Sequence, residues 1–374
     1  MDGCLLLTLL MVPGQELQGW ISTLISLILL IMVLVLSFTS QQMQVLRWRW
    51  EIERNLNKLE TLVQNARSMV IKKFKERYKV DPVGKLDRML EFFTIEPVSD
   101  DPRYVMERLE HLLDVRKSRF ETFTKSILPE ASDAERANAE VTVEALIALN
   151  TLYRVIRHYL YLGKKLNSMY IIMQLHMLLP LLMRQAYALY NCLGAFIDGK
   201  PIGDGIGPIV AAHLIGKSKV KRIAKDTVYA KVKKFDRNLF VVKAEGPGGN
   251  VGKLGDAVKN LIAKYRIDAV IMVDAALKLE GELSGSVVDG VGAAIGGPGV
   301  DKYKIEEICR KKKIPLYAVI VKEDYEEAIT PIKKEIIDST DEVIKRIGEI
   351  LLENTEKDGN VIIACAGNTI GVGQ

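Results

Sequence analysis

The stretch "GKPIGDGIGPIVAAHLIG" (Gly199–Gly216) separates two halves of the sequence that differ in character. Before it, apolar residues recur mostly at helical spacing; after it, short apolar runs alternate with amphipathic helical segments. Strands that alternate with helices indicate a mainly parallel, twisted sheet that is covered by helices on both faces. We therefore predict a helical region at residues 40–198 and an α/β domain at residues 199–374, and a helix that begins near Pro208.

A segment near the N-terminus is apolar enough to cross a membrane. No charged residue lies between Glu16 and Arg47, and this window contains "WISTLISLILLIMVLVLSF" (Trp20–Phe38). A helix needs about 20 such residues to span a bilayer. We predict a transmembrane helix at residues 20–39 after a short outer segment at residues 1–19. A cleaved signal peptide fits less well, because no basic residue precedes the run.

The orientation of this span follows from the basic residues beside it. Arg47, Arg49, Arg54 and Lys58 follow the span closely, and no basic residue precedes it. Basic residues favour the cytoplasmic side of a membrane. We therefore expect a single-pass protein of the cell membrane, with its N-terminus outside and most of its mass in the cytoplasm. Its first partner is the lipid bilayer.

A helical stalk is predicted after the span. Apolar residues recur at alternating intervals of four and three, which is a heptad seam: Ile52, Leu56, Leu59, Val63, Ala66 and Val70. Two interpretations remain open. The stalk either pairs with a second copy as a coiled coil, which gives a homo-oligomer, or it packs as an amphipathic helix on its own chain.

A second apolar segment at residues 168–183 raises the question of a further span. Gln174, His176, Pro180 and Arg184 interrupt this region, and its clean apolar run is shorter than the about 20 residues that a span requires. We therefore favour a buried helix, with His176 as a hydrogen-bonded core histidine.

Composition and spacing argue against several classes of site. The net charge of +5 is spread along the chain, so we expect no nucleic-acid partner. The four cysteines have no CxxC spacing and the four histidines form no HExxH, so we predict no metal site. The glycine turn reads GxGxG, and the chain has no GxxxxGK[ST] motif, so we predict no nucleotide cofactor.

Two carboxylates are the best candidates for chemistry. Asp204 lies in the glycine turn before a helix, and Asp274 ends the apolar strand "VIMVDAA". The carboxyl ends of parallel strands meet at one edge of a sheet, so the two side chains are expected to approach each other. When two carboxylates are close, one holds a proton and the other can activate water. We predict Asp204 and Asp274 as catalytic residues of an acid-type hydrolase.

Glycine-rich turns at the other strand ends form a candidate binding site around these carboxylates. Backbone N–H groups at such turns and at helix N-termini can hold an anion or polarise a carbonyl group. Lys253 is a candidate phosphate partner, whereas Lys278 would neutralise Asp274 and leave binding without hydrolysis. The predicted ligand-binding residues are Gly205, Gly207, Glu245, Gly248, Gly249, Asn250, Lys253, Lys278, Gly297, Gly299 and Asn368. The alternative function is therefore a non-catalytic sensor or scaffold that binds an anion or a peptide.

Three motifs also carry a resemblance to known peptidases. "DGIGP" (Asp204–Pro208), "VIMVDA" (Val270–Ala275) and "GVGAAIGGPG" (Gly290–Gly299) occur in the order of the spore germination protease, and more loosely of the hydrogenase maturation peptidases. The resemblance implies their α/β fold and an aspartic-type endopeptidase, in which Asp204 and Asp274 match the catalytic aspartates. The metal of the maturation peptidases is not expected, because no histidine follows His213. The whole layout resembles an uncharacterised archaeal single-span membrane protein family.

The order of one strand departs from those peptidases. There, a strand that ends in GxGN precedes the aspartate turn, whereas here a helix precedes it and "VIIACAGNTIG" (Val361–Gly371) stands at the C-terminus. We therefore predict a circular permutation, in which this last strand enters the sheet beside the turn and brings Asn368 next to Asp204.

Overall fold

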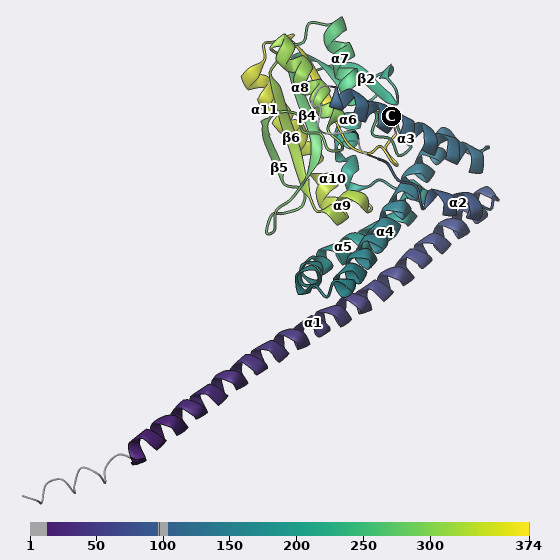
Figure 1. The fold of residues 1–374 in the computed structure, drawn as a ribbon. Helices are drawn as coiled ribbons and strands as arrows, with labels where there is room; N and C mark the ends of the chain where they lie inside the picture. Colours follow the sequence, from purple (N-terminus) through teal and green to yellow (C-terminus); the bar gives the residue numbers. More distant parts are fainter. Residues whose placement is uncertain (1–12, 96, 98–103, 374) are drawn as a thin grey trace, which may run out of the picture. The chain divides into compact units, whose positions relative to one another are not determined.

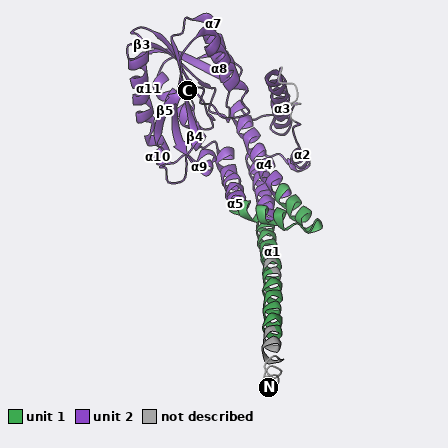
Figure 2. Cartoon of the chain, turned by 60° about the vertical axis from the view of Figure 1, so that its left-hand side comes forward, with its two compact units in different colours: residues 1–58, 155–180 green, residues 59–154, 181–374 purple. Residues whose placement is uncertain are grey.

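The computed structural model describes residues 13–95, 97 and 104–373, which fall into two compact units (Figures 1 and 2). Unit 1 holds the residues up to Lys58 together with Val155–Pro180, and unit 2 holds the rest. Three long helices pass from one unit into the other: α1 (Pro13–Tyr78), α4 (Asp133–Lys165) and α5 (Met169–Asp198). Of the predicted outer segment at residues 1–19, residues 1–12 lie outside the described residues.

The predicted span and stalk form a single uninterrupted helix, α1. Among the described residues, α1 is the one helix long and apolar enough to cross a membrane. Its apolar side chains between Trp20 and Leu36 are exposed, so the chain itself does not cover them. The helix ends at Tyr78, and Lys79 then adopts a left-handed backbone with φ 54°.

The heptad seam is covered within a single chain. All six seam residues are buried, with between 0% and 9% of their surface exposed. A side chain already packed against its own chain is not free to form a seam with a second copy. The structure therefore favours the amphipathic helix over the self-pairing coiled coil.

Helix α5 has one covered face and one exposed face. Ile172 and Leu175 are buried, whereas Tyr170 and Met177 are 63% and 71% exposed. The predicted buried helix is thus covered on one face only. Within unit 1, His176 Nε2 lies 2.8 Å from a carboxylate oxygen of Glu51, which gives this half-buried histidine its partner.

Two further helices belong to the helical part of unit 2. α2 (Val83–Met89) and α3 (Val105–Ile127) follow α1 along the chain. Helix α4 begins with a capping box: the Ser132 N–H donates to the Glu135 carboxylate at 3.0 Å, and the Glu135 N–H donates to Ser132 Oγ at 3.3 Å. Arg77 then pairs with Glu135 at 3.1 Å, which ties the end of α1 to the start of α4.

The α/β domain contains a seven-stranded sheet of mixed direction, in the order β1-β2-β3-β7-β4-β6-β5. The four strands β3, β7, β4 and β6 are parallel, and the outer pairings are antiparallel. The parallel pairing that we expected for most of the sheet is thus confined to its four central strands. The strands are β1 (Lys221–Ala224), β2 (Thr227–Lys234), β3 (Arg237–Ala244), β4 (Ala269–Leu277), β5 (Val287–Val291), β6 (Leu316–Glu323) and β7 (Asn360–Cys365).

Helices cover both faces of this sheet, as the alternation of strands and helices predicted. One face packs against α6 (Ile206–Ile215), α10 (Lys334–Asp338) and α11 (Thr340–Asn354). The other packs against α7 (Leu254–Lys264) and α8 (Val300–Lys312), and the short α9 (Tyr325–Ile329) follows β6. Alternate residues of each central strand enter the two cores, because successive side chains of a strand point to opposite faces.

The C-terminal strand β7 lies in the middle of the sheet, between β3 and β4. Ala364 is the register partner of both Val242 and Met272. The chain beyond β7 reaches the glycine turn, where the Asn368 N–H donates to Asp204 Oδ2 at 2.8 Å. Asn368 therefore lies beside Asp204, where the permutation hypothesis places it.

Candidate active site

Three carboxyl side chains gather at the carboxyl edge of the parallel strands. Asp204 lies in a single turn of 3₁₀ helix, η1 (Gly203–Gly205), which leads into α6. Asp274 lies near the end of β4, and Glu323 is the last residue of β6. Because β4 and β6 are parallel neighbours, their carboxyl ends lie on the same side of the domain.

The predicted pair, Asp204 and Asp274, interacts electrostatically. Asp274 is 6% exposed, and it accepts N–H groups from Ala275 at 2.8 Å and from Gly296 at 3.0 Å. Burial, and next the charge of Asp204, raise the pKa of Asp274 to about 7 in spite of these hydrogen bonds. Burial also raises the pKa of Asp204, against the opposing effect of the Asn368 N–H. The pair is thus arranged to hold a proton near neutral pH.

Glu323 is the third carboxyl group, and the sequence analysis missed it. It is 1% exposed, and neither carboxylate oxygen has a hydrogen-bond partner within the part of the chain that the structure describes. Burial, followed by the charges of Asp204, Glu327 and Asp274, raises its pKa to about 9. A signal was present in the sequence, because Glu323 follows the apolar residues of "LYAVIVKE" as Asp274 follows the apolar run "VIMV".

Glu327 lies four residues further along the chain, on α9, and its pKa is shifted in the opposite direction. Burial disfavours its charge, but hydrogen bonds from Lys333, the Asp324 N–H and Ser284 outweigh that effect and lower its pKa to about 2. Lys278 donates to Ser284 at 2.8 Å and lies 3.9 Å from Glu327 Oε2. The predicted cation of the site is therefore directed toward the Glu327 cluster and not toward Asp274.

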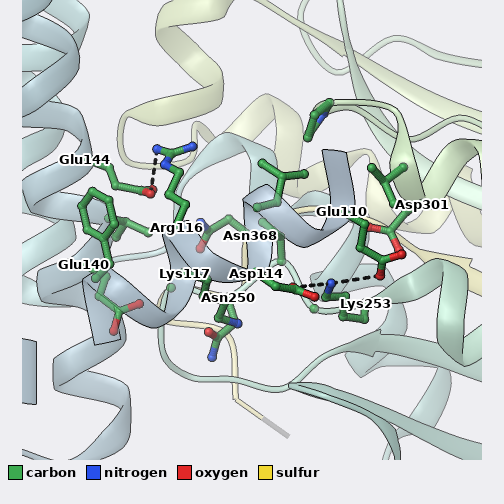
Figure 3. Close-up of a pocket in the computed structure, with 18 of the residues that line it drawn as sticks. Glu110, Asp114, Arg116, Lys117, Glu140, Glu144, Asn250, Lys253, Asp301 and Asn368 are labelled. Atoms are coloured by element: carbon green, nitrogen blue, oxygen red, sulfur yellow. Dashed lines mark hydrogen bonds and ion pairs between the residues drawn. The ribbon is translucent and has the colours of Figure 1, made fainter. Parts of the chain in front are cut away.

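A cavity of about 320 Å³ lies at this end of the domain, and Figure 3 shows the residues that line it. Gly296 and Asn368, whose N–H groups donate to Asp274 and Asp204, both line this cavity. Five of the predicted ligand-binding residues lie together in its wall: Gly249, Asn250, Lys253, Gly299 and Asn368. The geometry is that of a pocket with paired carboxyl groups beside it.

The opposite wall of the cavity comes from helices α3 and α4, which sequence reasoning did not connect with the site. Their contributing charged residues are Glu110, Asp114, Arg116, Lys117, Glu140 and Glu144. Arg116 pairs with Glu144 at 2.9 Å, and Lys117 pairs with Asp226. Burial raises the pKa of Glu140 to about 7, although Thr124 donates to it. Charged side chains on amphipathic helices are usually solvated, so no local pattern marked them.

The loop at Glu245–Lys253 forms hydrogen bonds and ion pairs with helices α3 and α4. The Gly249 N–H donates to Asn138 Oδ1 on α4 at 2.9 Å. Lys253 Nζ lies 2.6 Å from Asp114 and 3.3 Å from Glu110, so two carboxylates already neutralise the expected phosphate partner. These contacts attach the glycine loop to the helical wall of the cavity.

The ion pairs of Lys253 lead to a prediction about stability. Replacing Lys253 with alanine should lower the free energy of unfolding by about 1–2 kcal/mol, because Asp114 loses its cation. A hydrogen bond to a charged group contributes about 1.5–3 kcal/mol, and solvent screening at the half-exposed Asp114 reduces this value. Lys259→Ala, on the exposed face of α7, is the control and should change stability by less than about 0.5 kcal/mol. Chemical denaturation of the purified full chain measures both values. Equal stability of the two variants would contradict a structural role for these ion pairs.

The other predicted ligand-binding residues of the glycine turns, and Glu245, do not line the cavity. A side-chain atom on Gly205 would approach the Asn368 carbonyl oxygen, and one on Gly207 would overlap the Ala366 carbonyl group. Gly248 packs against Ala134 and Ala137 of α4, whereas Gly297 is exposed, with φ 85°. Glu245 accepts two hydrogen bonds from Arg222, at 2.8 and 2.9 Å, and is not part of the cavity wall.

Among the described residues, no group of three or more His, Cys, Asp or Glu side chains is arranged to hold a metal ion.

The chain belongs to a family described as "Protein of unknown function (DUF1512)". The model of its N-terminal domain matches residues 26–199, and the model of its C-terminal domain matches residues 202–373. No curated protein and no solved structure matches the chain. The two matched regions meet near the glycine turn that opens the α/β domain.

Proposed function

We propose that the α/β domain is a hydrolase of the aspartic-peptidase type, in which Asp204 and Asp274 share one proton. The observation that carries this proposal is the electrostatic coupling of two aspartates that are distant in sequence, with the charge of Asp204 helping to raise the pKa of Asp274 to about 7. A carboxyl group that is half protonated near neutral pH can act as acid or as base. The proposal is tested by hydrolysis of casein, or of the chain itself, by the purified protein.

In the proposed reaction the pair acts on a water molecule and a peptide carbonyl group. The ionised carboxylate accepts one proton as the water oxygen bonds to the carbonyl carbon, and the protonated carboxyl gives its proton to the carbonyl oxygen. The carboxyl group that took the water proton then gives it to the amide nitrogen as the C–N bond breaks, and the other carboxylate takes one hydroxyl proton from the tetrahedral intermediate. An acid and an amine are released, and the pair again holds one proton. The Gly296 and Asn368 N–H groups donate to the two aspartates, so these two amides hold the pair in place and do not polarise the substrate.

A peptide is the proposed substrate, and the cavity beside the pair is its proposed binding site. Backbone groups of the glycine loops and charged groups of both signs from α3 and α4 line the cavity, and such a wall can bind the polar backbone of a peptide. The alternative function, capture of an anion without hydrolysis, has less support, because Lys253 and the Gly249 N–H already have partners within the protein.

The relation to the spore germination protease is also part of the proposal. The placement of β7 between β3 and β4, and the bond from Asn368 to Asp204, support a circularly permuted version of that fold. The archaeal origin that the layout suggested remains a prediction.

We further propose that α1 anchors the chain in the cell membrane with unit 2 in the cytoplasm. The described native cysteines Cys192, Cys309 and Cys365 are buried, so labelling needs an introduced site. Val291, which is 84% exposed on β5, is suitable.

A cysteine at Val291 in a Cys4→Ser background should react with a membrane-impermeant maleimide only after the cells are permeabilised. The same reagent should label Cys4 of the wild-type chain in intact cells, because that residue precedes the proposed span. Labelling of Val291→Cys in intact cells would reverse the proposed orientation.

A further inference from the structure

The turn that joins α4 to α5 within unit 1 exposes apolar side chains (Figure 2). Leu166, Met169 and Tyr170 are 60%, 40% and 63% exposed, and Lys164 and Lys165 end α4 beside them. We call residues 164–170 the hairpin tip. Apolar side chains that gather on a surface with charged residues around them mark a site of interaction with a membrane or with another protein. The hairpin tip is therefore a candidate contact surface.

Contacts within unit 1 fix the hairpin tip to α1. Arg49 Nη2 donates to Asn167 Oδ1 at 2.9 Å, and Lys164 pairs with Glu53. Asn167 has a left-handed backbone, with φ 46°, which asparagine adopts more readily than most residues where a helix ends. The tip therefore lies beside the stretch of α1 from Arg49 to Glu53, and α1 itself sets its distance from the predicted span.

The position of Arg49 on α1 brings the hairpin tip close to the bilayer. Arg49 lies ten residues after the end of the predicted span at residue 39, and ten residues of helix are about 15 Å long. The headgroup layer of one leaflet takes up about 5–8 Å of this length. The remaining distance is about one Debye length at physiological ionic strength, so charged residues at this level interact with the headgroups.

The charges around the hairpin tip are complementary to an anionic membrane. Beyond the predicted span, unit 1 (residues 40–58 and 155–180) contains seven basic side chains and two acidic ones. The basic residues are Arg47, Arg49, Arg54, Lys58, Arg157, Lys164 and Lys165. Both acidic side chains have a partner within the unit, since Glu51 lies 2.8 Å from His176 and Glu53 pairs with Lys164. Basic residues just beyond a span are attracted to anionic headgroups, and tyrosine side chains favour the membrane interface.

We infer that the hairpin tip is a lipid-binding surface, which docks on the anionic headgroups of the leaflet nearest to it. This inference rests on the proposed anchoring of α1 in the membrane. Leu166 and Tyr170 enter the headgroup layer, and Arg47 and Lys165 attract the lipid phosphates. The span then attaches unit 1 to the bilayer at one place and the hairpin tip at a second, which restricts the tilt of α1.

The full chain, reconstituted in nanodiscs of phosphatidylcholine and phosphatidylglycerol, allows the test. A bimane label on Tyr170→Cys in a Cys4→Ser background reports on the tip, because the described native cysteines are buried. A phospholipid that carries a nitroxide on its headgroup should quench most of this fluorescence. Lys58→Cys is the control, because Lys58 is exposed on α1 nine residues beyond Arg49, which is about 14 Å farther from the span. Its label should lose much less fluorescence.

The charge of the tip gives a second measurement with the same label. Arg47→Gln combined with Lys165→Gln should lower the equilibrium constant for docking by about fivefold for each residue, since a basic side chain near an anionic surface contributes about that much. Lys58→Gln should have little effect, because that residue lies more than a Debye length farther away. High salt, or nanodiscs of phosphatidylcholine alone, should weaken the quenching at Tyr170→Cys in the same way.

The outcomes separate this inference from the proposals on which it rests. Equal quenching at Tyr170→Cys and Lys58→Cys would overturn the inference and leave the anchoring intact, as would quenching by a nitroxide on a second copy of the chain in place of the lipid. Full quenching in phosphatidylcholine alone would contradict the recognition of anionic lipid. A chain that does not insert into nanodiscs would overturn the anchoring and the inference together. Casein hydrolysis tests the aspartate pair separately, and the tip variants should retain the wild-type rate.

Discussion

Asp274→Asn should lower the rate of peptide hydrolysis by about 10²- to 10⁴-fold, which is the range that a general acid or base contributes. Asparagine keeps the size of aspartate but can neither hold nor release the proton of the pair. Asp204→Asn should have an effect of the same order, because the two groups share that proton. The double variant should be no slower than the slower single variant, since residues that act as a unit are not additive.

Initial rates of casein cleavage by the detergent-solubilised full chain measure this effect at pH 6. Asp289→Asn is the control, because Asp289 is an exposed aspartate on β5 of the same domain and its pairing with Arg346 lies on the surface. It should retain the wild-type rate. Wild-type activity in Asp274→Asn would remove the aspartate pair from the mechanism, whatever the other variants show.

Much of the site could be predicted because it depends on strand ends. The apolar run before Asp274 defined β4, and the rule that ligands gather beyond the carboxyl ends of parallel strands brought it toward Asp204. Glu323 satisfies the same rule. It follows Lys322, however, and a Lys–Glu pair at a strand end is typical of a solvated edge, so the sequence alone favours the wrong environment.

The sequence did not predict β1, β5 or the helical wall of the cavity, because their sequence patterns are weak or depend on segments far apart in the chain. β1 has four residues and β5 has five, and both lie at the edges of the sheet, where side chains are mostly exposed and apolar alternation is faint. The helical wall of the cavity depends on tertiary packing between α3, α4 and the glycine loops. The periodicity within a single segment cannot predict such packing, so Glu110 and Asp114 are indistinguishable from ordinary surface charges in the sequence.

Gly207→Ala should be among the most destabilising single substitutions in the α/β domain. Gly207 lies in the first turn of α6, where helix propensity alone would favour alanine by up to about 1 kcal/mol. The structure predicts the opposite sign, because a side-chain carbon on Gly207 would overlap the backbone carbonyl group of Ala366, just after β7. We expect a loss of about 3 kcal/mol, at the upper end of the usual effect of overpacking.

The unfolding temperature of the full chain measures this loss. For a domain of this size, about 3 kcal/mol corresponds to a decrease of about 10 °C. Gly194→Ala in α5 is the matched control, since a side chain there meets no atom within 4 Å and should leave the protein equally stable or slightly more stable. The close contact also positions Asn368 against Asp204, so Gly207→Ala should lose hydrolysis together with stability. A Gly207→Ala variant as stable as Gly194→Ala would mean that β7 does not pack against the Asp204 turn, and the site would lose its structural basis.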